Sequence, residues 1–77
     1  MENPYLDTVK QTVAEVFGCD PGTLTDEMGP GDIPQWDSLG HIMLLEALSA
    51  RAEREFPLER AIEAKNIRGL AELLERG

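Results

Sequence analysis

The chain is organised around one junction, Trp-Asp-Ser-Leu-Gly-His-Ile at residues 36–42. A stretch rich in glycine and proline precedes this junction, and apolar residues recur every three or four positions after it. We expect Asp37 to cap a helix, because an N-cap aspartate accepts a hydrogen bond from a free backbone N–H. Ser38 then begins that helix, with its hydroxyl exposed at the positive end of the helix dipole.

The helix after Asp37 is predicted to run to about Glu55 and to end near Phe56 and Pro57, because proline cannot continue a helix. Its inward stripe follows helical spacing and consists of Leu39, Ile42, Leu45, Leu48 and Ala52. The outward face is then expected to hold Gly40, Met43, Glu46, Ala47, Ala50 and Arg54.

The segment before the junction predicts one helix and a long loop. Asn3 can cap a helix over residues 4–17 with Pro4 in its first position, and Gly18 ends it. The apolar stripe of this helix consists of Leu6, Val9, Val13, Val16 and Phe17. Residues 18–36 have no sustained period and predict a loop. Four spaced apolar residues are expected to pin this loop to the bundle: Leu24, Met28, Ile33 and Trp36.

The segment after the junction predicts two further helices. A short helix over residues 58–64 should turn Leu58, Ala61 and Ile62 inward. Asn66 can cap a last helix whose core-facing residues are Ile67, Leu70, Leu73 and Leu74. The sequence therefore predicts a single all-α domain over residues 1–77, a small four-helix bundle with three longer helices, one short helix and a long first loop.

Composition narrows the classes of function. Seven basic residues stand against 15 acidic ones, a net charge of −8, which would repel the phosphates of nucleic acid. We find no signal peptide and no apolar run of membrane-spanning length, so we expect a cytoplasmic protein that does not bind membranes. Cys19 and His41 are the only cysteine and histidine. They can form neither a disulfide nor a zinc site, and Cys19 is expected to be a partly buried loop residue.

Ser38 could act as a nucleophile or as a point of attachment. A nucleophilic serine needs a base, a group that orients the base and an oxyanion hole. His41 lies one helical turn away, but no orienting group or pocket is evident, so we do not expect an enzyme. An exposed hydroxyl at a helix start instead suits a covalently attached phosphate, which the N–H groups of the first turn stabilise. The alternative is an ordinary serine at the start of a helix.

The stretch WDSLGHI resembles the attachment site of the acyl carrier protein family, which includes the peptidyl carrier proteins. Asp37, Ser38 and Leu39 match the family's Asp-Ser-Leu. The order of predicted elements agrees with that family over essentially the whole chain. The resemblance implies that a phosphopantetheinyl transferase attaches 4′-phosphopantetheine from coenzyme A to Ser38, with magnesium. The thiol of this arm would carry acyl or aminoacyl groups as thioesters. The resemblance also implies that Asp37 assists the transferase and that Leu39 anchors the helix start in the core.

The predicted docking face is less acidic than in carriers of fatty-acid synthesis. It consists of Gly40, Met43, Glu46 and Ala47, and Gly40 and Met43 stand where those carriers often have acidic residues. We therefore expect a free-standing, monomeric carrier that serves acyl- or aminoacyl-loading and processing enzymes of a specialised pathway, such as polyketide or nonribosomal peptide synthesis.

Several alternatives stay open from the sequence. The chain could be a small acidic helical interaction module with no prosthetic group, or a carrier domain cut from a larger synthase. His41 either contacts the phosphate of the arm or is solvated. Ile42, Leu45 and Ile62 are candidate walls of a cleft for a bound chain, and the sequence leaves undecided whether such a cleft forms.

Overall fold

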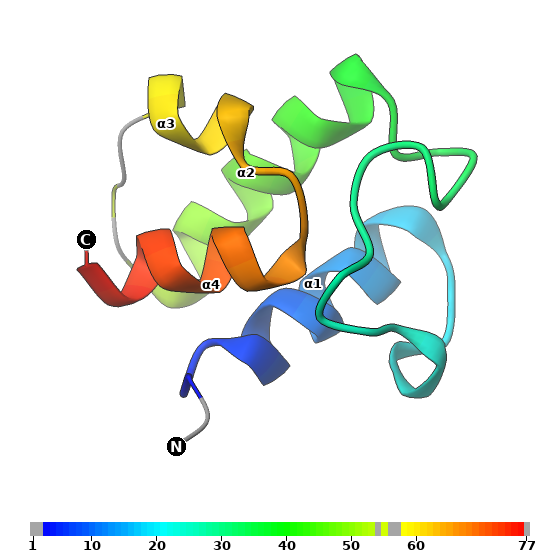
Figure 1. Ribbon diagram of the computed structural model, residues 1–77, viewed down its shortest axis with the longest axis horizontal. Coiled ribbons are helices and arrows are strands. Elements are labelled where there is room, and N and C mark those ends of the chain that lie inside the picture. The colour runs from blue at the N-terminus through cyan, green and yellow to red at the C-terminus, as the bar shows by residue number, and fades with distance from the viewer. Residues whose placement is uncertain (1–2, 54, 56–57, 77) are drawn as a thin grey trace.

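The computed structural model describes residues 3–53, 55 and 58–76. Within these residues it contains four α-helices, one 3₁₀ turn and no strand, which confirms the predicted all-α fold (Figure 1). In chain order the elements are α1 (Leu6–Phe17), η1 (Pro21–Thr23), α2 (Ser38–Ala52), α3 (Leu58–Glu63) and α4 (Ile67–Arg76).

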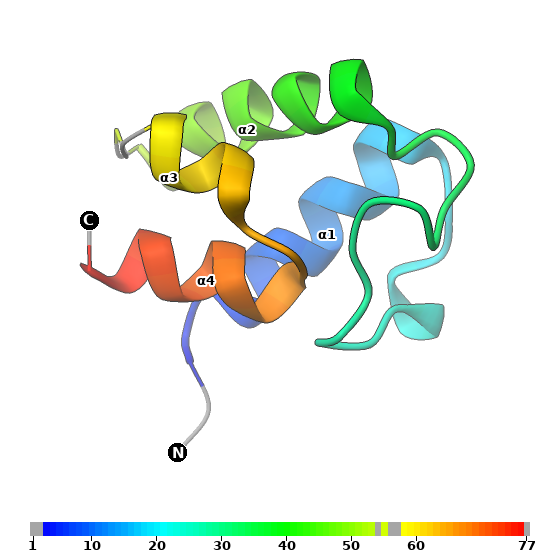
Figure 2. The ribbon, with the colours of Figure 1, turned by 45° about the horizontal axis from the view of Figure 1, so that its top comes forward.

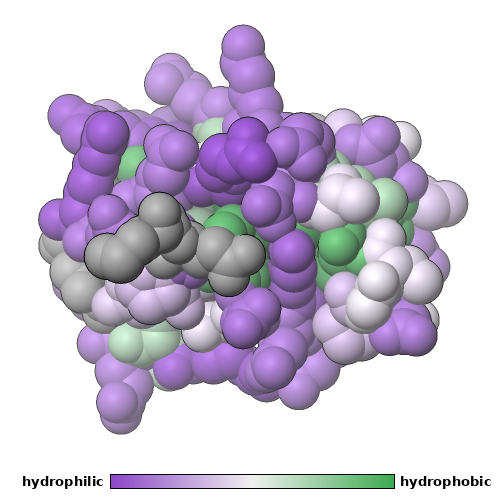
Figure 3. All heavy atoms as spheres, turned by 60° about the horizontal axis from the view of Figure 1, so that its bottom comes forward, coloured by the Kyte–Doolittle hydropathy of each residue, from purple (hydrophilic) through white to green (hydrophobic). Residues whose placement is uncertain are grey.

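The helices enclose one core. Helix α1 packs against both α2 and α4, and the short α3 contacts α2 and α4 (Figure 2). The largest fully buried apolar side chains are Trp36, Leu44, Leu45, Leu48, Ile67, Leu70 and Leu74. The face seen in Figure 3 is mostly hydrophilic, with hydrophobic atoms in small areas between polar side chains. No helix in the described part of the chain is both long and apolar enough to cross a membrane.

Most predicted helix ends are confirmed, and three differ; the smallest difference is at α3, which ends at Glu63, one residue before the predicted end. Gly18 ends α1 in the left-handed conformation at φ 71°, as predicted. Helix α1 begins at Leu6 instead of Pro4, because Asn3 forms a turn in which its Oδ1 accepts the N–H of Tyr5 at 2.8 Å. Helix α2 ends at Ala52, before the predicted Glu55, since Glu53 adopts the left-handed conformation at φ 54°.

The last two helices follow the prediction in part. Asn66 caps α4 through a 2.8 Å bond from the N–H of Gly69 to its Oδ1. Ala61 of α3 is buried as predicted, but Ile62 is 53% exposed, so its inward placement is wrong. Leu73 is only partly buried, and the buried Ala71 was not predicted. The predictions for Arg54, Phe56, Pro57 and the side chain of Leu58 fall outside the described residues.

The long loop is pinned by the apolar residues that the sequence indicated. Leu24 and Trp36 are buried, and Met28 and Ile33 are partly buried against the core. Backbone bonds add to this anchoring: the N–H of Ile67 donates to the carbonyl of Met28 at 2.8 Å. Cys19 is half-buried, as expected. The loop forms the side of the molecule opposite the C-terminus, where it connects α1 to α2 (Figure 1).

An ion-pair cluster fastens the same loop to two helices. Asp26 contacts Lys10 of α1 at 2.8 Å and Arg68 of α4 at 3.6 Å, and Arg68 also contacts Glu27 at 2.6 Å. The hydrogen bond from Lys10 is the main reason that the pKa of Asp26 lies below its ordinary value of 3.8. The charge of Arg68 acts in the same direction.

Because of this ion-pair cluster, Asp26→Asn should change how the stability of the chain depends on pH. Because the pKa of Asp26 is lowered in the folded chain, its stabilising effect is present above the ordinary value and is lost as the pH falls through the folded-state value. We expect Asp26→Asn to lower the melting temperature at pH 7. The melting temperature of this variant should also fall less than that of the wild type below about pH 4. Circular dichroism melts from pH 2 to 7 measure both effects.

Glu27→Gln is the control for that experiment. Glu27 is exposed, and within this cluster it contacts only Arg68. An exposed pair contributes little to stability, so the melting temperature should barely change. Equal effects of the two substitutions would show that Asp26 does not hold the loop.

Candidate functional site

The predicted cap at the start of α2 is present. Asp37 has extended backbone geometry, and its Oδ1 accepts the N–H of Gly40 at 2.8 Å. Its carbonyl accepts the N–H of His41 at 2.8 Å, which begins the helical hydrogen-bond pattern. Ser38 is the first residue of α2, and its side chain is exposed. The hydroxyl therefore lies in the open beside the N–H groups of a helical first turn, where an anion is favoured.

Gly40 is buried, so its predicted place on the docking face is wrong. A Cβ at this position would lie 2.2 Å from the carbonyl oxygen of Gln35 and 3.0 Å from Cε1 of Phe17. The chain folds back just before Asp37 and brings the Gln35 carbonyl over the backbone of Gly40. Gly40 thus allows the turn that presents Ser38, and it contributes no surface for a partner.

The buried face of α2 agrees with the prediction at Leu45 and Leu48 and differs from it in the first turns of the helix. Leu39 is 68% exposed, so the anchoring role that the resemblance implied for it is wrong. Ile42 was also expected to point inward, and it is 40% exposed. The residues that face the core are Gly40, His41, Leu44, Leu45 and Leu48.

The physical reason for the difference in the first turns is His41, which is only 5% exposed. The indole N–H of Trp36 donates to its Nδ1 at 2.8 Å, and its Nε2 lies 2.8 Å from the carbonyl oxygen of Ala61. A buried polar side chain is tolerated when its hydrogen bonds are satisfied, and here both ring nitrogens have partners. The expectations that His41 is solvated or reaches an attached phosphate are both wrong for this geometry.

The same two bonds decide what His41 can do for Ser38. A general base needs a free nitrogen within hydrogen-bond reach of the hydroxyl. The two ring nitrogens of His41 are bonded to Trp36 and Ala61. In this arrangement His41 does not take the proton of Ser38. The described residues also contain no group of three or more metal-ligating side chains.

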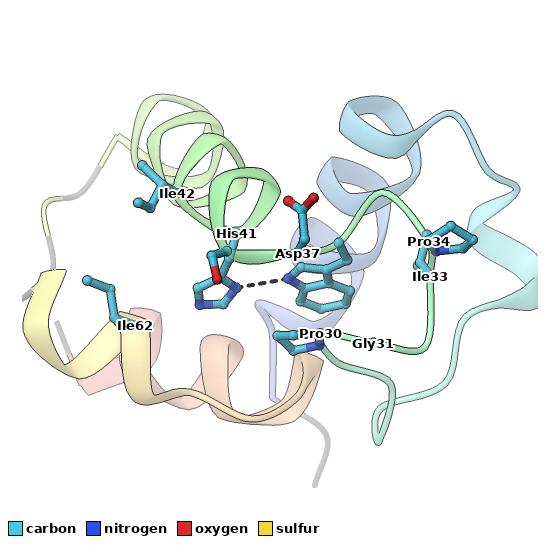
Figure 4. Close-up of a pocket in the computed structure, with 10 residues that line it drawn as sticks. Pro30, Gly31, Ile33, Pro34, Asp37, His41, Ile42 and Ile62 are labelled. Carbon is cyan, nitrogen blue, oxygen red and sulfur yellow. Dashed lines mark hydrogen bonds between the residues drawn. The ribbon is translucent and has the colours of Figure 1, made fainter.

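Two hollows of the described structure lie at the start of α2, and Ser38 lines the larger of them. The larger has a volume of about 550 Å³ and lies between the loop, the start of α2 and α3; its lining includes Ser38, Trp36, His41, Ile42 and Ile62. Figure 4 shows Ile42 of α2 and Ile62 of α3 at the edge of this pocket, with the imidazole of His41 beside them. Both isoleucines were candidate cleft walls. Leu45, the third candidate, is buried and is not among the lining residues.

The smaller hollow lies between the end of α1 and the start of α2. It has a volume of about 250 Å³, and its lining includes Val16, Phe17, Leu39 and Met43. Met43 is 53% exposed and Glu46 is exposed, as predicted, whereas Ala47 is half-buried. The exposed large apolar side chains of the described chain are Leu39, Ile42, Met43 and Ile62. Three of these lie on α2 within two helical turns of Ser38.

Comparison with known proteins adds no relative. No protein-family model matches the chain, and no curated protein matches it.

Sequence reasoning found Asp37 and Ser38 but missed the contacts of His41 and the close packing of Gly40. The sequence does hold a signal for the first of these. Its only tryptophan and its only histidine flank the predicted cap, five residues apart, so that a donor and an acceptor lie close to one helix start. The partner on α3, the carbonyl of Ala61, has no such signal.

Proposed function

We propose that this chain is a carrier protein that bears a 4′-phosphopantetheine arm on Ser38. The observation that carries the proposal is the exposed hydroxyl of Ser38 at the first residue of α2, behind the Asp37 cap and at the rim of a pocket of about 550 Å³. The likeness of Asp37, Ser38 and Leu39 to the attachment motif of acyl carrier proteins supports it. On this proposal the chain is not itself an enzyme.

The local geometry fits an attached phosphodiester. An anion at a helix N-terminus is stabilised by free N–H groups and by the dipole. Asp37 adds a negative charge nearby, but its Oδ1 is held by the N–H of Gly40 and its side chain is exposed, so solvent screens the repulsion. The walls of the pocket supply apolar surface from Ile33, Ile42 and Ile62.

The attachment step would be a phosphoryl transfer in a transferase complex with magnesium. The Ser38 oxygen forms a bond to the phosphorus that carries the pantetheine in coenzyme A. The bond from that phosphorus to the nucleotide breaks, and the nucleotide leaves with the electron pair. The hydroxyl proton passes to a base of the transferase, because both nitrogens of His41 are occupied. The arm then supplies the thiol for acyl or aminoacyl thioesters.

Partner enzymes would dock on the exposed face of α2 next to Ser38. This face presents Leu39 and Met43, 68% and 53% exposed, together with the exposed carboxylate of Glu46. Exposed apolar residues that gather around one site mark interaction surfaces. We therefore propose docking through apolar contacts, by a phosphopantetheinyl transferase and by loading and processing enzymes of a specialised pathway such as polyketide or nonribosomal peptide synthesis. The carrier would be monomeric and cytoplasmic.

Intact mass measurement tests the proposal directly. The purified chain is incubated with coenzyme A, magnesium and a promiscuous phosphopantetheinyl transferase. We expect one phosphopantetheine per chain in the wild type and none in Ser38→Ala, because that substitution removes the accepting oxygen. Ser49 is the only other serine, also on α2, so Ser49→Ala is the matched control and should be fully modified.

Two outcomes would contradict the proposal. One is an unmodified wild type in the presence of a transferase that modifies a known carrier in the same tube. The other is equal modification of wild type and Ser38→Ala. The first outcome would favour the alternative, a small acidic helical interaction module without a prosthetic group, for which the exposed Leu39 and Met43 would be the binding surface.

A further inference from the structure

His41 joins three separate parts of the structure. Trp36 ends the long loop and is 1% exposed, His41 lies in the first turns of α2, and Ala61 lies on α3 and is fully buried. The indole N–H of Trp36 donates to Nδ1 of His41, and the carbonyl of Ala61 lies against Nε2, each at 2.8 Å. These two bonds link the Ser38 end of α2 to the short helix α3. The dashed line in Figure 4 marks the bond that His41 accepts from the loop.

These contacts select one protonation state. An indole N–H only donates, and a carbonyl oxygen only accepts. Both bonds therefore form only when His41 is neutral, with its proton on Nε2. A second proton, on Nδ1, would face the N–H of Trp36, and two donors would meet with no acceptor between them.

The surroundings offer no charge to compensate a second proton. Thr12 is the only other buried polar side chain in the described part of the chain, and its hydroxyl donates to the Thr8 carbonyl. On the elements that meet at His41 the charged side chains are exposed; they are Asp32 and Asp37 in the loop next to Trp36, Glu46 and Arg51 on α2, and Glu59, Arg60 and Glu63 on α3. A buried imidazolium is costly without a partner, so the second proton favours an arrangement in which the ring is released.

We propose that His41 is a proton-controlled latch that holds α3 against the Ser38 end of the molecule. The latched state binds one proton fewer than the released state, so acidification shifts the population toward release. Trp36, His41 and Ile62 all line the pocket of about 550 Å³ beside Ser38. Release frees α3 from His41 and widens this pocket. The latch is a property of the unmodified chain, so it does not depend on the proposed carrier function.

Nuclear magnetic resonance of the unmodified chain tests the latch. Trp36 and His41 are the only tryptophan and histidine, so their ring signals need no further assignment. At about pH 8 we expect the ¹⁵N shifts of the Nε2-protonated tautomer and an indole N–H protected from exchange. On acidification to about pH 5, protection of the indole N–H should fall about tenfold beyond the intrinsic pH effect. The Ala61 carbonyl shift should change with the same midpoint.

His41→Gln is the matched variant, because its side-chain amide offers an acceptor to Trp36 and a donor to Ala61 but does not titrate. We expect the indole protection and the Ala61 shift to be the same at both pH values. Trp36→Phe is the second variant: it removes the opposing donor but leaves a protonated ring buried without a partner, so the Ala61 shift should keep only part of its pH dependence. The response to Asp26 falls near pH 4 or below and is separated from this range.

Three results would overturn the latch: a neutral tautomer with its proton on Nδ1, an indole protection that acidification leaves unchanged, or the same pH response in His41→Gln as in the wild type.

Discussion

Gly40→Ala is expected to destabilise the chain by about 1–3 kcal/mol, the usual cost of forcing an extra methyl group into a packed site. The added Cβ would lie 2.2 Å from the carbonyl oxygen of Gln35, a backbone atom that a side-chain rotation cannot move. The gain in helix propensity from alanine, up to about 1 kcal/mol, is too small to offset this clash. Urea denaturation followed by circular dichroism measures the loss.

Gly69→Ala is a closely matched control. Gly40 and Gly69 are each the third residue of a helix, and each donates its N–H at 2.8 Å to the Oδ1 of the capping residue, Asp37 or Asn66. A Cβ at Gly69 would meet only side-chain or Cα atoms, the nearest of them 3.3 Å away. We therefore expect Gly69→Ala to be neutral or slightly stabilising. Equal losses in both variants would mean that the Gln35 contact does not matter.

The same substitution bears on the proposed function. Relief of the clash at Gly40 must shift either the Gln35 carbonyl or the first turn of α2, which begins with Ser38. We expect the folded fraction of Gly40→Ala to accept phosphopantetheine more slowly than the wild type does. Gly69→Ala, on the far helix, should be modified at the wild-type rate.

Trp36→Ala should cost about 3–5 kcal/mol, the range measured for removing large aromatic side chains from cores. Trp36 is 1% exposed and stacks on Phe17 with ring centroids 5.6 Å apart. A chain of this size has roughly 4–12 kcal/mol of total stability at 0.05–0.15 kcal/mol per residue, so the loss is a large fraction. Thermal unfolding followed by far-ultraviolet circular dichroism is the measurement, since the substitution removes the only tryptophan.

Two variants separate the contributions of this side chain. Trp36→Phe keeps an aromatic ring beside Phe17 but leaves Nδ1 of His41 without its donor, so we expect an intermediate loss of about 1–3 kcal/mol. Met43→Ala removes an exposed side chain and should change stability by less than about 0.5 kcal/mol. A Trp36→Ala variant no less stable than Trp36→Phe would show that the ring does not anchor the loop.

Local patterns along the chain predicted the helices because helix formation depends on neighbouring residues. Gly18, Asp37 and Asn66 were recognised as helix ends, since each acts on backbone groups within four residues of itself. The spaced apolar residues of the loop were recognised as anchors for the same reason: hydrophobicity alone places Leu24 and Trp36 in the core. The exposed Ser38 also followed from its position directly after a cap.

The orientation of α2 was decided by tertiary structure. Hydrophobicity favoured burying Leu39 and Ile42, yet the helix buries His41 and leaves both apolar residues exposed. The reason is that Trp36 and the distant carbonyl of Ala61 satisfy both nitrogens of the imidazole, so the cost of burying it is removed.

The sequence by itself determined an all-α chain with a capped serine at the start of its central helix, because caps and helical periods are local. Tertiary contacts alone decided which face of that helix is buried, that Gly40 must lack a side chain, and that a pocket lies beside Ser38. Each of these depends on atoms that only folding brings together: the Gln35 carbonyl over Gly40, the Ala61 carbonyl against His41, and Ile62 near Ile42.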